Sequence, residues 1–358
     1  MANNQIVKAP ALTSAIRAIV KGTGASDRDA DLVATNLVEA NLKGHDSHGV
    51  GMIPRYVDSW QEGGLAPTAH VSINLDSNAL LRLDGNRGYG QVVGFEAMEL
   101  GAERAKRHGV CVVGLSNAHH IGRIGHWAEQ CIGHGLVSIH FVNVLSRPIV
   151  APWGGRDARH GTNPFCVGVP RAGGDPIVLD FATSRIAQGK TRVAYNKGEK
   201  LEPGTIIDDR GNPTVEPRFT VIDPSGAILP FGEHKGSGIA LICEILGGAL
   251  AGGLTEKGGD ARGRRVLNGM LSILIDPGKL GTAENLAREI EGFVAWHTAS
   301  PPAAGVTRIK IAGDPEREWK KERLANGIPV DEATWNELLG SADKVGMQRA
   351  EFQALAGA

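Results

Sequence analysis

The sequence predicts an α/β protein in which an α/β domain is inserted into a helical domain formed by both ends of the chain. Three patterns lead to this prediction. The first 65 residues show only helical patterns, strand and helix patterns alternate from about residue 78, and the chain from Asp314 onward is again charged amphipathic helix. Alternation of strands and helices is typical of α/β domains. The predicted helical domain therefore comprises residues 1–77 and 314–358, and the predicted α/β domain comprises residues 78–313.

Three helices are predicted in the N-terminal region. The first covers residues 11–21, and the second runs from an N-cap at Ser26 to Lys43, where Gly44 follows. Pro54 suits the first turn of the third helix. Apolar residues at helical spacing indicate that third helix: Ile53, Tyr56, Val57 and Trp60.

The middle of the chain is predicted to alternate between strands and helices. Short apolar or β-branched runs predict strands at 79–83, 110–115, 136–142, 165–169, 177–181, 270–275 and 307–311. Apolar residues three and four positions apart predict helices at 95–109, 124–135, 238–251 and 283–296. The C-terminal region from residue 314 shows no strand pattern.

Composition and charge exclude several classes of protein. The 358 residues include 38 Lys and Arg and 39 Asp and Glu, which gives a net charge of −1. Non-specific nucleic-acid binding needs a cationic surface, so no nucleic-acid partner is expected. The most apolar stretch, residues 239–254, contains Glu244 and is shorter than the roughly 20 residues of a membrane span. We therefore expect no membrane partner.

The N-terminus and the cysteines favour a cytoplasmic location. Residues 1–8 lack the apolar segment of a secretory signal. The four cysteines form no CxxC pair, which disfavours both structural disulfides and a zinc-thiolate site. They are Cys111, Cys131, Cys166 and Cys243.

The first candidate for chemistry is the segment 44–50 (GHDSHGV), which lies between two predicted helices. Asp46 and Ser47 are good capping residues, so His48 is expected near the N-terminus of a helix. Such a position disfavours the imidazolium ion and lets free N–H groups bind an anion such as a carboxylate. His48 is then a candidate proton donor to a carbonyl oxygen. The alternative is a capping loop whose histidines pack or face water.

A second candidate, residues 116–123 (SNAHHIGR), follows a predicted strand. Functional residues of α/β domains gather beyond the carboxyl ends of strands, which favours a role for His119 and His120. With His126 these histidines also suggest a metal, but the chain has no HExxH motif and the nearby carboxylates lack ligand spacing. We therefore predict no metal.

A glycine-rich segment, 88–94 (GYGQVVG), lies between a predicted strand and a predicted helix. This order suggests a Rossmann dinucleotide site. That interpretation requires an acidic residue at the end of a second strand about 20 residues later, where the chain has Arg107, His108 and Gly109 instead. A glycine turn with close helix packing is therefore favoured.

Three further segments occur downstream: 161–164 (GTNP), 179–184 (LDFATS) and 229–238 (LPFGEHKGSG). In the last of them Lys235 opens a glycine-rich helix start, an arrangement that suits a phosphate or pyrophosphate. The segment is not a Walker loop. Asp180 is equally compatible with capping a helix.

Together these segments resemble the malate/L-lactate dehydrogenase type 2 family, which also includes ureidoglycolate, sulfolactate and diketogulonate dehydrogenases and piperideine-2-carboxylate reductases. The segment KGHDSHGVGMIPRYV (43–57) especially resembles the hydroxycarboxylate dehydrogenase B branch, whose members reduce aryl- or carboxyalkyl-substituted 2-oxo acids. The matching segments occur in order along almost the whole chain: DSHGV (46–50), GYGQVVG (88–94), SNAHHIG (116–122), APWGG (151–155), GTNPF (161–165), LDFATS (179–184), LPFGEHKGSG (229–238) and IKIAGDPE (309–316).

The resemblance implies an oxidoreductase that uses NAD or NADP bound to an α/β domain that is not a Rossmann fold. It implies a homodimer whose active site lies between the helical and α/β parts. By matching motifs, it assigns the catalytic acid/base position to His48 beside Ser47, and in some relatives to the histidine at His120. The implied cofactor contacts are Asp180, Phe181, Ala182, Thr183, Ser184, His234, Lys235, Gly313 and Asp314.

One position departs from the family pattern. Many relatives carry an arginine four residues after the SHG histidine, where this chain has Met52. The substrate carboxylate is then expected to bind Arg55, one helical turn later, with Thr162 and Asn163 as the next candidates. A methionine also makes the pocket more apolar, which favours larger or aromatic 2-oxo acids.

The leading hypothesis is hydride transfer between NAD(P)H and a 2-oxo acid, with His48 or His120 protonating the carbonyl oxygen. Three alternatives stay open. They are reduction of a cyclic imine carboxylate, a metal-dependent hydrolase built on the histidines, and a dinucleotide-binding sensor without activity. The intact SHG and NAHHIG segments argue against the sensor.

Overall fold

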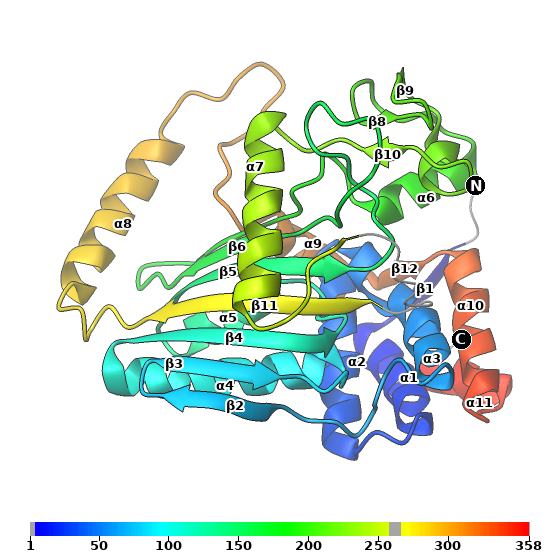
Figure 1. The fold of residues 1–358 in the computed structure, drawn as a ribbon, viewed down its shortest axis with the longest axis horizontal. Coiled ribbons are helices and arrows are strands. Elements are labelled where there is room, and N and C mark those ends of the chain that lie inside the picture. Colours follow the sequence, from blue (N-terminus) through cyan, green and yellow to red (C-terminus); the bar gives the residue numbers. More distant parts are fainter. Residues whose placement is uncertain (1–3, 258–265, 358) are drawn as a thin grey trace.

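The computed structural model describes residues 4–257 and 266–357 and contains a central sheet, helices on its faces and a group of helices beside it (Figure 1). The α-helices are α1 (Ala9–Gly22), α2 (Asp27–Leu42), α3 (Ile53–Gln61), α4 (Gly90–His108), α5 (Gly125–Gly133), α6 (Gln188–Lys197), α7 (His234–Cys243), α8 (Ala283–Thr298), α9 (Asp314–Asn326), α10 (Glu332–Lys344) and α11 (Arg349–Ala356). The strands are β1 (Gln5–Val7), β2 (Ser72–Ser77), β3 (Leu80–Asp84), β4 (Val110–His119), β5 (Val137–Leu145), β6 (Phe165–Val169), β7 (Ile177–Phe181), β8 (Ile206–Ile207), β9 (Pro213–Thr214), β10 (Ala227–Ile228), β11 (Leu267–Ile275) and β12 (Ile328–Val330). The 3₁₀ turns are η1 (Asp46–His48), η2 (Val50–Met52) and η3 (Pro217–Thr220), and η4 (Glu244–Leu250) is π-helical.

The central sheet has the strand order β2-β3-β4-β11-β5-β6-β7. Among these described strands β3 and β4 run parallel, and the other neighbouring pairs are antiparallel. Val113 of β4 packs against Gly101 of α4, whereas the next residue, Gly114, approaches Ala251 after η4. Successive strand residues point to opposite faces, so α4 and η4 cover opposite sides of the sheet. This architecture confirms the predicted α/β class, and its mixed sheet differs from the parallel sheet of a Rossmann fold.

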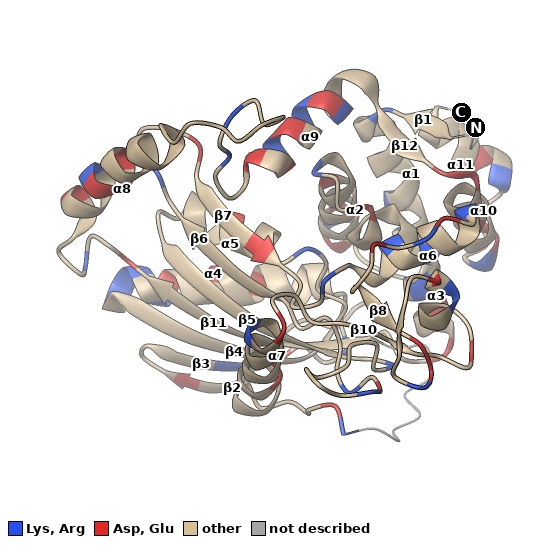
Figure 2. Ribbon diagram, turned by 90° about the horizontal axis from the view of Figure 1, so that it is seen from above, with Lys and Arg blue, Asp and Glu red and all other residues tan. Residues whose placement is uncertain are grey.

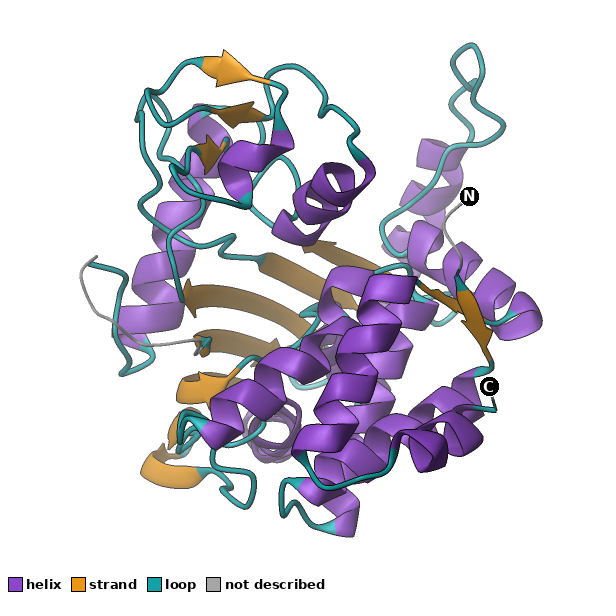
Figure 3. Cartoon of the chain, turned by 90° about the vertical axis from the view of Figure 1, so that its right-hand side faces the viewer, coloured by secondary structure: helices purple, strands orange, loops and turns teal. Residues whose placement is uncertain are grey.

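Helices from both ends of the chain share one apolar core beside the sheet (Figure 3). Leu12 of α1, Leu37 of α2 and Tyr56 of α3 are buried in this core together with Leu338 of α10 and Phe352 of α11. The antiparallel pairing of β1 with β12 also joins the two ends. The segment between α2 and α3, which carries His48, is thereby held between this core and the sheet.

The predicted helices of the N-terminal region are confirmed. Ser26 caps α2, because its hydroxyl accepts a hydrogen bond from the backbone N–H of Asp29. In α1 the buried residues Leu12, Ile16 and Ile19 recur at helical spacing, which explains the amphipathic pattern of that segment.

Two predictions about strands are wrong. Residues 307–311 form a mostly exposed loop, and the backbone N–H of Ile311 bonds to the Asp314 carboxylate at the start of α9 instead of joining a ladder. The C-terminal region, expected to lack strands, contains β12, because residues 328–330 pair with β1. In addition, β4 extends four residues beyond its expected end and includes Ser116 to His119.

Some elements have no signal in the sequence. All six residues of β2 are exposed, and α6 has two buried residues, Thr191 and Ala194, so neither shows a clear apolar period. The strands of the small sheet β10-β8-β9 have two residues each. The helix expected at 238–251 begins earlier, at His234, and continues as η4.

Candidate active site

The two motif histidines meet in space. His48 lies at the end of η1, and His120 follows directly after β4. Their rings are parallel within 3° with centroids 5.3 Å apart, and His48 Nδ1 lies 3.2 Å from His120 Nε2. The other nitrogen of His120, Nδ1, lies 2.7 Å from the hydroxyl of Tyr56 on α3. Elements that are distant in sequence therefore place two imidazoles in one hydrogen-bonded pair.

Both histidines of the pair are neutral at pH 7. Burial of the ring lowers the pKa of His48 to about 4, and the nearby charges of His45 and Arg123 lower this pKa in the same direction. Burial also lowers the pKa of His120 well below its usual value, with further contributions from His48, His119 and Arg55. A neutral imidazole has one N–H donor and one acceptor nitrogen, so the pair is suited to passing a proton.

The DSHGV motif has a different structural basis from the one expected. Asp46 was expected to cap a helix, but its carboxylate is bound by Arg323 of α9 at 2.6 Å and by the Asn41 amide at 2.6 Å. The side-chain oxygen of Asn41 also accepts the backbone N–H of Val50 at 2.8 Å. A Cβ at Gly49 would lie 2.2 Å from that same oxygen, so a glycine is required there. His48 is thus positioned by a polar clamp in which Asn41 and Arg323 are buried and Asp46 is exposed.

The glycine-rich segment 88–94 supports the histidines. A Cβ at Gly90 would lie 2.2 Å from the backbone oxygen of His120 and 2.4 Å from that of His119. A Cβ at Gly94 would lie 2.7 Å from the Trp127 ring. The favoured interpretation, a glycine turn with close packing, is confirmed, because α4 begins in direct contact with the backbone that carries His120.

Gly90→Ala is expected to destabilise the protein by about 1–3 kcal/mol, because the new methyl group forces the backbone of residues 119–120 to move. The free energy of unfolding, measured by chemical denaturation, and the activity should both decrease. The matched control is Gly133→Ala in α5, where a Cβ meets no atom within 4 Å. Equal stability of the two variants would contradict the role assigned to Gly90.

Three motif segments meet in one place. The Thr183 N–H and hydroxyl both donate to the backbone oxygen of Thr162, at 2.9 and 2.8 Å. The Phe231 N–H donates to the backbone oxygen of Thr183, and the Phe181 ring lies 5.2 Å from the Phe231 ring. Segments 161–165, 180–184 and 229–235 therefore form one connected unit, in which Thr183 and Ser184 are buried.

Some implied contacts are occupied by other residues of the chain. Asp180 accepts the backbone N–H of Gly125 at 2.7 Å, at the first residue of α5, so the capping alternative describes its geometry. Asp314 is ion-paired with Arg308 and Arg317.

Asn163 also has a structural role. It is fully buried, and its amide bonds to Val144 N, Ala240 O and Glu244, which fix it within the fold. Its neighbour Thr162 is half-buried.

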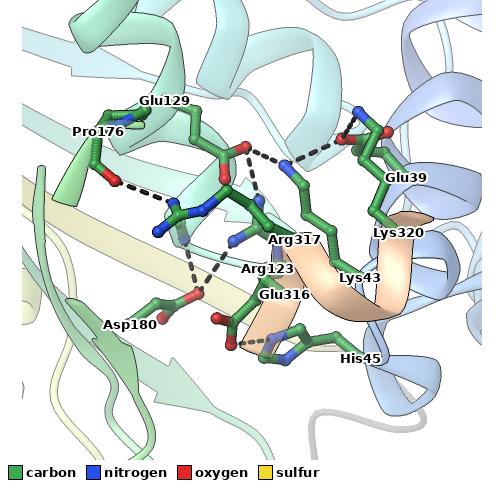
Figure 4. Close-up of polar contacts among 11 residues, drawn as sticks. Glu39, Lys43, His45, Arg123, Glu129, Pro176, Asp180, Glu316, Arg317 and Lys320 are labelled. Atoms are coloured by element: carbon green, nitrogen blue, oxygen red, sulfur yellow. Dashed lines mark hydrogen bonds and ion pairs between the residues drawn. The ribbon is translucent and has the colours of Figure 1, made fainter. Parts of the chain in front are cut away.

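A cavity of about 360 Å³ lies where α2, α5, β7 and α9 meet (Figure 4). Figure 2 shows that α9 carries residues of both signs of charge. Gly313 also lines the cavity. The charged lining comprises Lys43, Arg123, Arg317, Lys320, Glu39, Glu129, Asp180 and Glu316. Each of the four cations has a carboxylate within 4 Å, so these side chains are already paired.

Lys235 and His234 begin α7 and are exposed. In the ranges 4–257 and 266–357, no ion pair is found for Lys235. The His234 ring lies 5.6 Å from that of Trp153, in an edge-to-face arrangement. Lys235 is therefore available to pair with an anion.

The expected carboxylate anchor, Arg55, lies on α3 one residue before Tyr56. Arg55 is exposed over much of its side chain, and its charge contributes to the lowered pKa of His119 and His120. A second arginine, Arg192 of α6, is close enough for the two charges to repel. Met52 is half-buried and packs against the helical core, so at most part of it faces a pocket.

Sequence reasoning missed two parts of this site. The sequence indicates Tyr56 as one residue of an apolar stripe and Gln91 as part of a glycine turn. In the structure Gln91 donates a hydrogen bond to the Tyr56 hydroxyl at 2.8 Å. The helix α6 was not predicted, yet a Cβ at its Gly189 would lie 2.7 Å from Ser47 Cβ. A polar residue within an otherwise apolar stripe is the one signal that points to Tyr56.

Neither a metal ligand set nor a membrane helix is found in the part of the chain that the structure describes. No group of three or more His, Cys, Asp or Glu residues there has the geometry to hold a metal ion. None of the helices there combines the length and the apolar character needed to cross a bilayer.

Comparison with known proteins identifies the family of this chain. The family model of malate/L-lactate dehydrogenase matches residues 7–339. Hydroxycarboxylate dehydrogenase B of Escherichia coli strain K12 is 46% identical over 352 residues, which cover 97% of this chain and 96% of that protein. The Δ1-pyrroline-2-carboxylate/Δ1-piperideine-2-carboxylate reductase of Pseudomonas syringae pv. tomato is 34% identical over 338 residues, 93% of this chain and 95% of that one. The solved sulfolactate dehydrogenase of Methanocaldococcus jannaschii gives a TM-score of 0.87 at 33% identity, covering 97% of this chain and 99% of that chain. The chain therefore belongs to the malate/L-lactate dehydrogenase family and is a 2-hydroxy-acid dehydrogenase.

Proposed function

We propose that this protein interconverts 2-hydroxy acids and 2-oxo acids, using NAD or NADP, and that it accepts 2-oxo acids with larger or aryl side chains. The observation that carries the proposal is the hydrogen-bonded pair of a half-buried His48 and a buried His120, in a member of this dehydrogenase family, with Arg55 close enough for its charge to lower the pKa of His120. The pair can exchange a proton with the substrate oxygen, and the arginine can bind the carboxylate beside it.

The residues present fit the nicotinamide cofactor that the family implies. The segments 161–165, 180–184 and 229–235 are connected by hydrogen bonds, and Lys235 at the start of α7 can pair with a phosphate. We propose that Ala182, Thr183, Ser184, His234 and Lys235 hold the cofactor, and that Gly313, which lines the cavity between α2, α5, β7 and α9, also contacts it. When bound, the cofactor supplies the hydride.

His48 is the proposed proton donor. A neutral imidazole N–H can donate to an oxygen on which negative charge develops, and in the reverse direction a neutral imidazole nitrogen can accept the hydroxyl proton. Because burial keeps the pKa of His48 at about 4, the ring is uncharged in both directions at pH 7. His120 and Ser47 flank it, and Gly189 of α6 packs against Ser47.

Arg55→Ala is expected to raise the KM of every 2-oxo acid about 10- to 100-fold, because a charge-assisted bond to the substrate carboxylate is lost. Steady-state kinetics with several 2-oxo acids measure this, and fluorescence titration should show unchanged cofactor affinity. Arg147→Ala is the control, since Arg147 is exposed and paired with Asp223. If Arg55→Ala leaves KM unchanged, the carboxylate is bound elsewhere, and Thr162 is the next residue to test.

Lys235→Ala is expected to raise the Kd of the dinucleotide about tenfold or more, because it removes a cation from a phosphate contact. Titration of NADH and NADPH by fluorescence measures both values. Lys279→Ala is the control, because Lys279 follows the far end of β11, where Ile275 pairs with Val110 rather than with the His119 end of β4. Equal Kd values in the two variants would exclude Lys235 from the cofactor site.

The alternative within the family is reduction of a cyclic imine carboxylate, which the similarity to the Pseudomonas syringae reductase supports. It needs the same hydride geometry but places a nitrogen opposite His48. Oxidation of NADH and NADPH should be measured with a panel of 2-oxo acids and cyclic imines. Turnover confined to the imines would replace the 2-oxo acid proposal.

We further propose a cytoplasmic homodimer, as the resemblance implies. The four cysteines are buried free thiols, which suits a reducing compartment. Leu241, Ile245 and Leu250 on α7 and η4 expose large apolar side chains, which suits burial against a second copy. Light scattering after size-exclusion chromatography tests the dimer, and a monomeric mass at micromolar concentration would contradict it.

A further inference from the structure

A continuous chain of hydrogen bonds leads from the helical core to His48. It begins at Gln91 on α4, whose Nε2 lies 2.8 Å from the Tyr56 hydroxyl. It continues over 2.7 Å from that hydroxyl to His120 Nδ1 and over 3.2 Å from His120 Nε2 to His48 Nδ1. Gln91 and Tyr56 are 1% and 0% exposed, so water does not compete for these bonds. Both residues lie outside the motifs that assign the proton donor.

The chemistry of the four groups gives the chain a direction. An amide nitrogen only donates, so the Tyr56 oxygen accepts from Gln91 and its own proton is directed to His120 Nδ1. A neutral His120 then carries its hydrogen on Nε2 and donates it to His48 Nδ1. A neutral His48 consequently carries its hydrogen on Nε2, the nitrogen that the chain leaves unused.

We propose that Tyr56 is a positioning residue that, together with Gln91, selects the tautomer of His48 with its hydrogen on Nε2 and so presents this N–H to the substrate oxygen during carbonyl reduction. This inference rests on the proposed function. The hydride adds to the carbonyl carbon and the His48 Nε2 proton goes to the oxygen. A proton from solvent then returns to His48 Nε2 at the open end of the chain, since His48 is only half-buried. One proton is consumed per carbonyl reduced, which balances the reaction.

The same chain can serve the reverse reaction. Oxidation of a hydroxy acid needs a lone pair on His48 Nε2, so every hydrogen bond of the chain must point the other way. Tyr56 would then donate to an acceptor on Gln91. Within the described ranges, Gln91 Oε1 is buried and has no hydrogen-bond partner, so rotation of the amide supplies that acceptor without breaking another bond.

Tyr89 provides a matched control for Tyr56. It is 1% exposed, and its ring lies edge-on to Tyr56 with the centroids 6.0 Å apart. The Tyr89 hydroxyl bonds to the Thr23 hydroxyl at 2.9 Å instead of to a histidine. Tyr56→Phe and Tyr89→Phe each remove one buried hydroxyl from the same core. Tyr56→Phe breaks the hydrogen bonds to Gln91 and His120, whereas Tyr89→Phe breaks the one to Thr23.

The first test is the tautomer itself, which needs neither turnover nor a variant. Long-range ¹H–¹⁵N correlation spectra of the ¹⁵N-histidine-labelled protein identify which ring nitrogen carries the hydrogen, with His48 and His120 assigned from their substitution. We expect hydrogen on Nε2 of both rings in the wild type and in Tyr89→Phe, and a change in Tyr56→Phe. Hydrogen on Nδ1 of His120 in the wild type overturns the inference, even if activity with 2-oxo acids is found.

The second test is kinetic. Tyr56→Phe is expected to lower kcat about 10- to 100-fold relative to Tyr89→Phe, with KM and cofactor Kd unchanged, since an orienting group acts on the reacting tautomer and not on binding. Thermal unfolding of the two variants shows whether they lose equal stability. A loss of kcat below tenfold relative to Tyr89→Phe overturns the inference. Absence of turnover in the wild type would instead count against the proposed function and would leave the spectroscopic result standing.

Discussion

His48→Asn is expected to lower kcat about 100- to 10,000-fold while the affinity for the nicotinamide cofactor stays nearly unchanged. The asparagine can keep one hydrogen bond to His120 but cannot transfer a proton to or from the substrate oxygen. The neighbouring segment should stay folded, because Asn41 and Arg323 hold Asp46, and Asn41 holds Val50, through bonds that do not involve His48. Steady-state kinetics and cofactor titration measure the two effects separately.

The control is His134→Asn. His134 lies after α5 and bonds to Glu99 at 2.9 Å, outside the site. It should retain wild-type turnover. If His48→Asn is also near wild type, the proton donor is His120, and the assignment made from the SHG motif is wrong.

Lowering the pH from 6.5 to about 4 is expected to cost the folded protein several kcal/mol of stability. Burial lowers the pKa of His48 and His126 to about 4 and that of His119 and His140 to about 3, and it lowers the pKa of His120 as well. In the unfolded chain these rings take up protons near pH 6.5, whereas the folded state keeps them neutral. Because the pKa values are lower in the folded state, the neutral histidines contribute their full stabilisation above pH 6.5. This contribution is lost as the pH falls toward the pKa values of the folded state.

His140 allows this effect to be measured away from the active site. It is fully buried in the sheet, where Ser272 and Ser138 bond to its two nitrogens at 2.8 and 2.9 Å. At pH 4.5 its neutral ring accounts for about 2–3 kcal/mol of the loss. In His140→Gln the decrease in unfolding free energy between pH 7 and pH 4.5 should shrink by that amount. His108→Gln, at an exposed histidine, should leave this decrease in unfolding free energy unchanged. An equal decrease in both variants would contradict this explanation.

The fold was predictable where buried residues recur in the sequence at the spacing of a helix or a strand. α1 shows its buried residues at helical spacing, and β4 and β11 are apolar runs because both of their faces are covered. β2, which is exposed throughout, leaves no such pattern. The apolar and β-branched residues at 307–311 suggested a strand, but the backbone N–H of Ile311 donates to the neighbouring Asp314 carboxylate. Strand formation there depends on pairing, which local sequence does not determine.

The candidate site was predictable at its motifs and not at their partners. His48 and His120 stand in segments that point to chemistry by residue type, and the structure places them 3.2 Å apart. Tyr56 and Gln91 contact them through packing of α3 and α4, which no spacing in the sequence encodes. The partners of Asn163 come from β5, α7 and η4, and its motif does not predict them.

The central claim is that His48 and His120 act as one proton-transferring unit, and a double-mutant cycle tests it most directly. Single-turnover rates of cofactor oxidation by a 2-oxo acid should be measured for the wild type, His48→Asn, His120→Asn and the double variant. If the two rings form one unit, the double variant will be no slower than the slower single variant, because either substitution already breaks the shared path. Losses that multiply, so that the double variant is slower by the product of the two single factors, would contradict the claim.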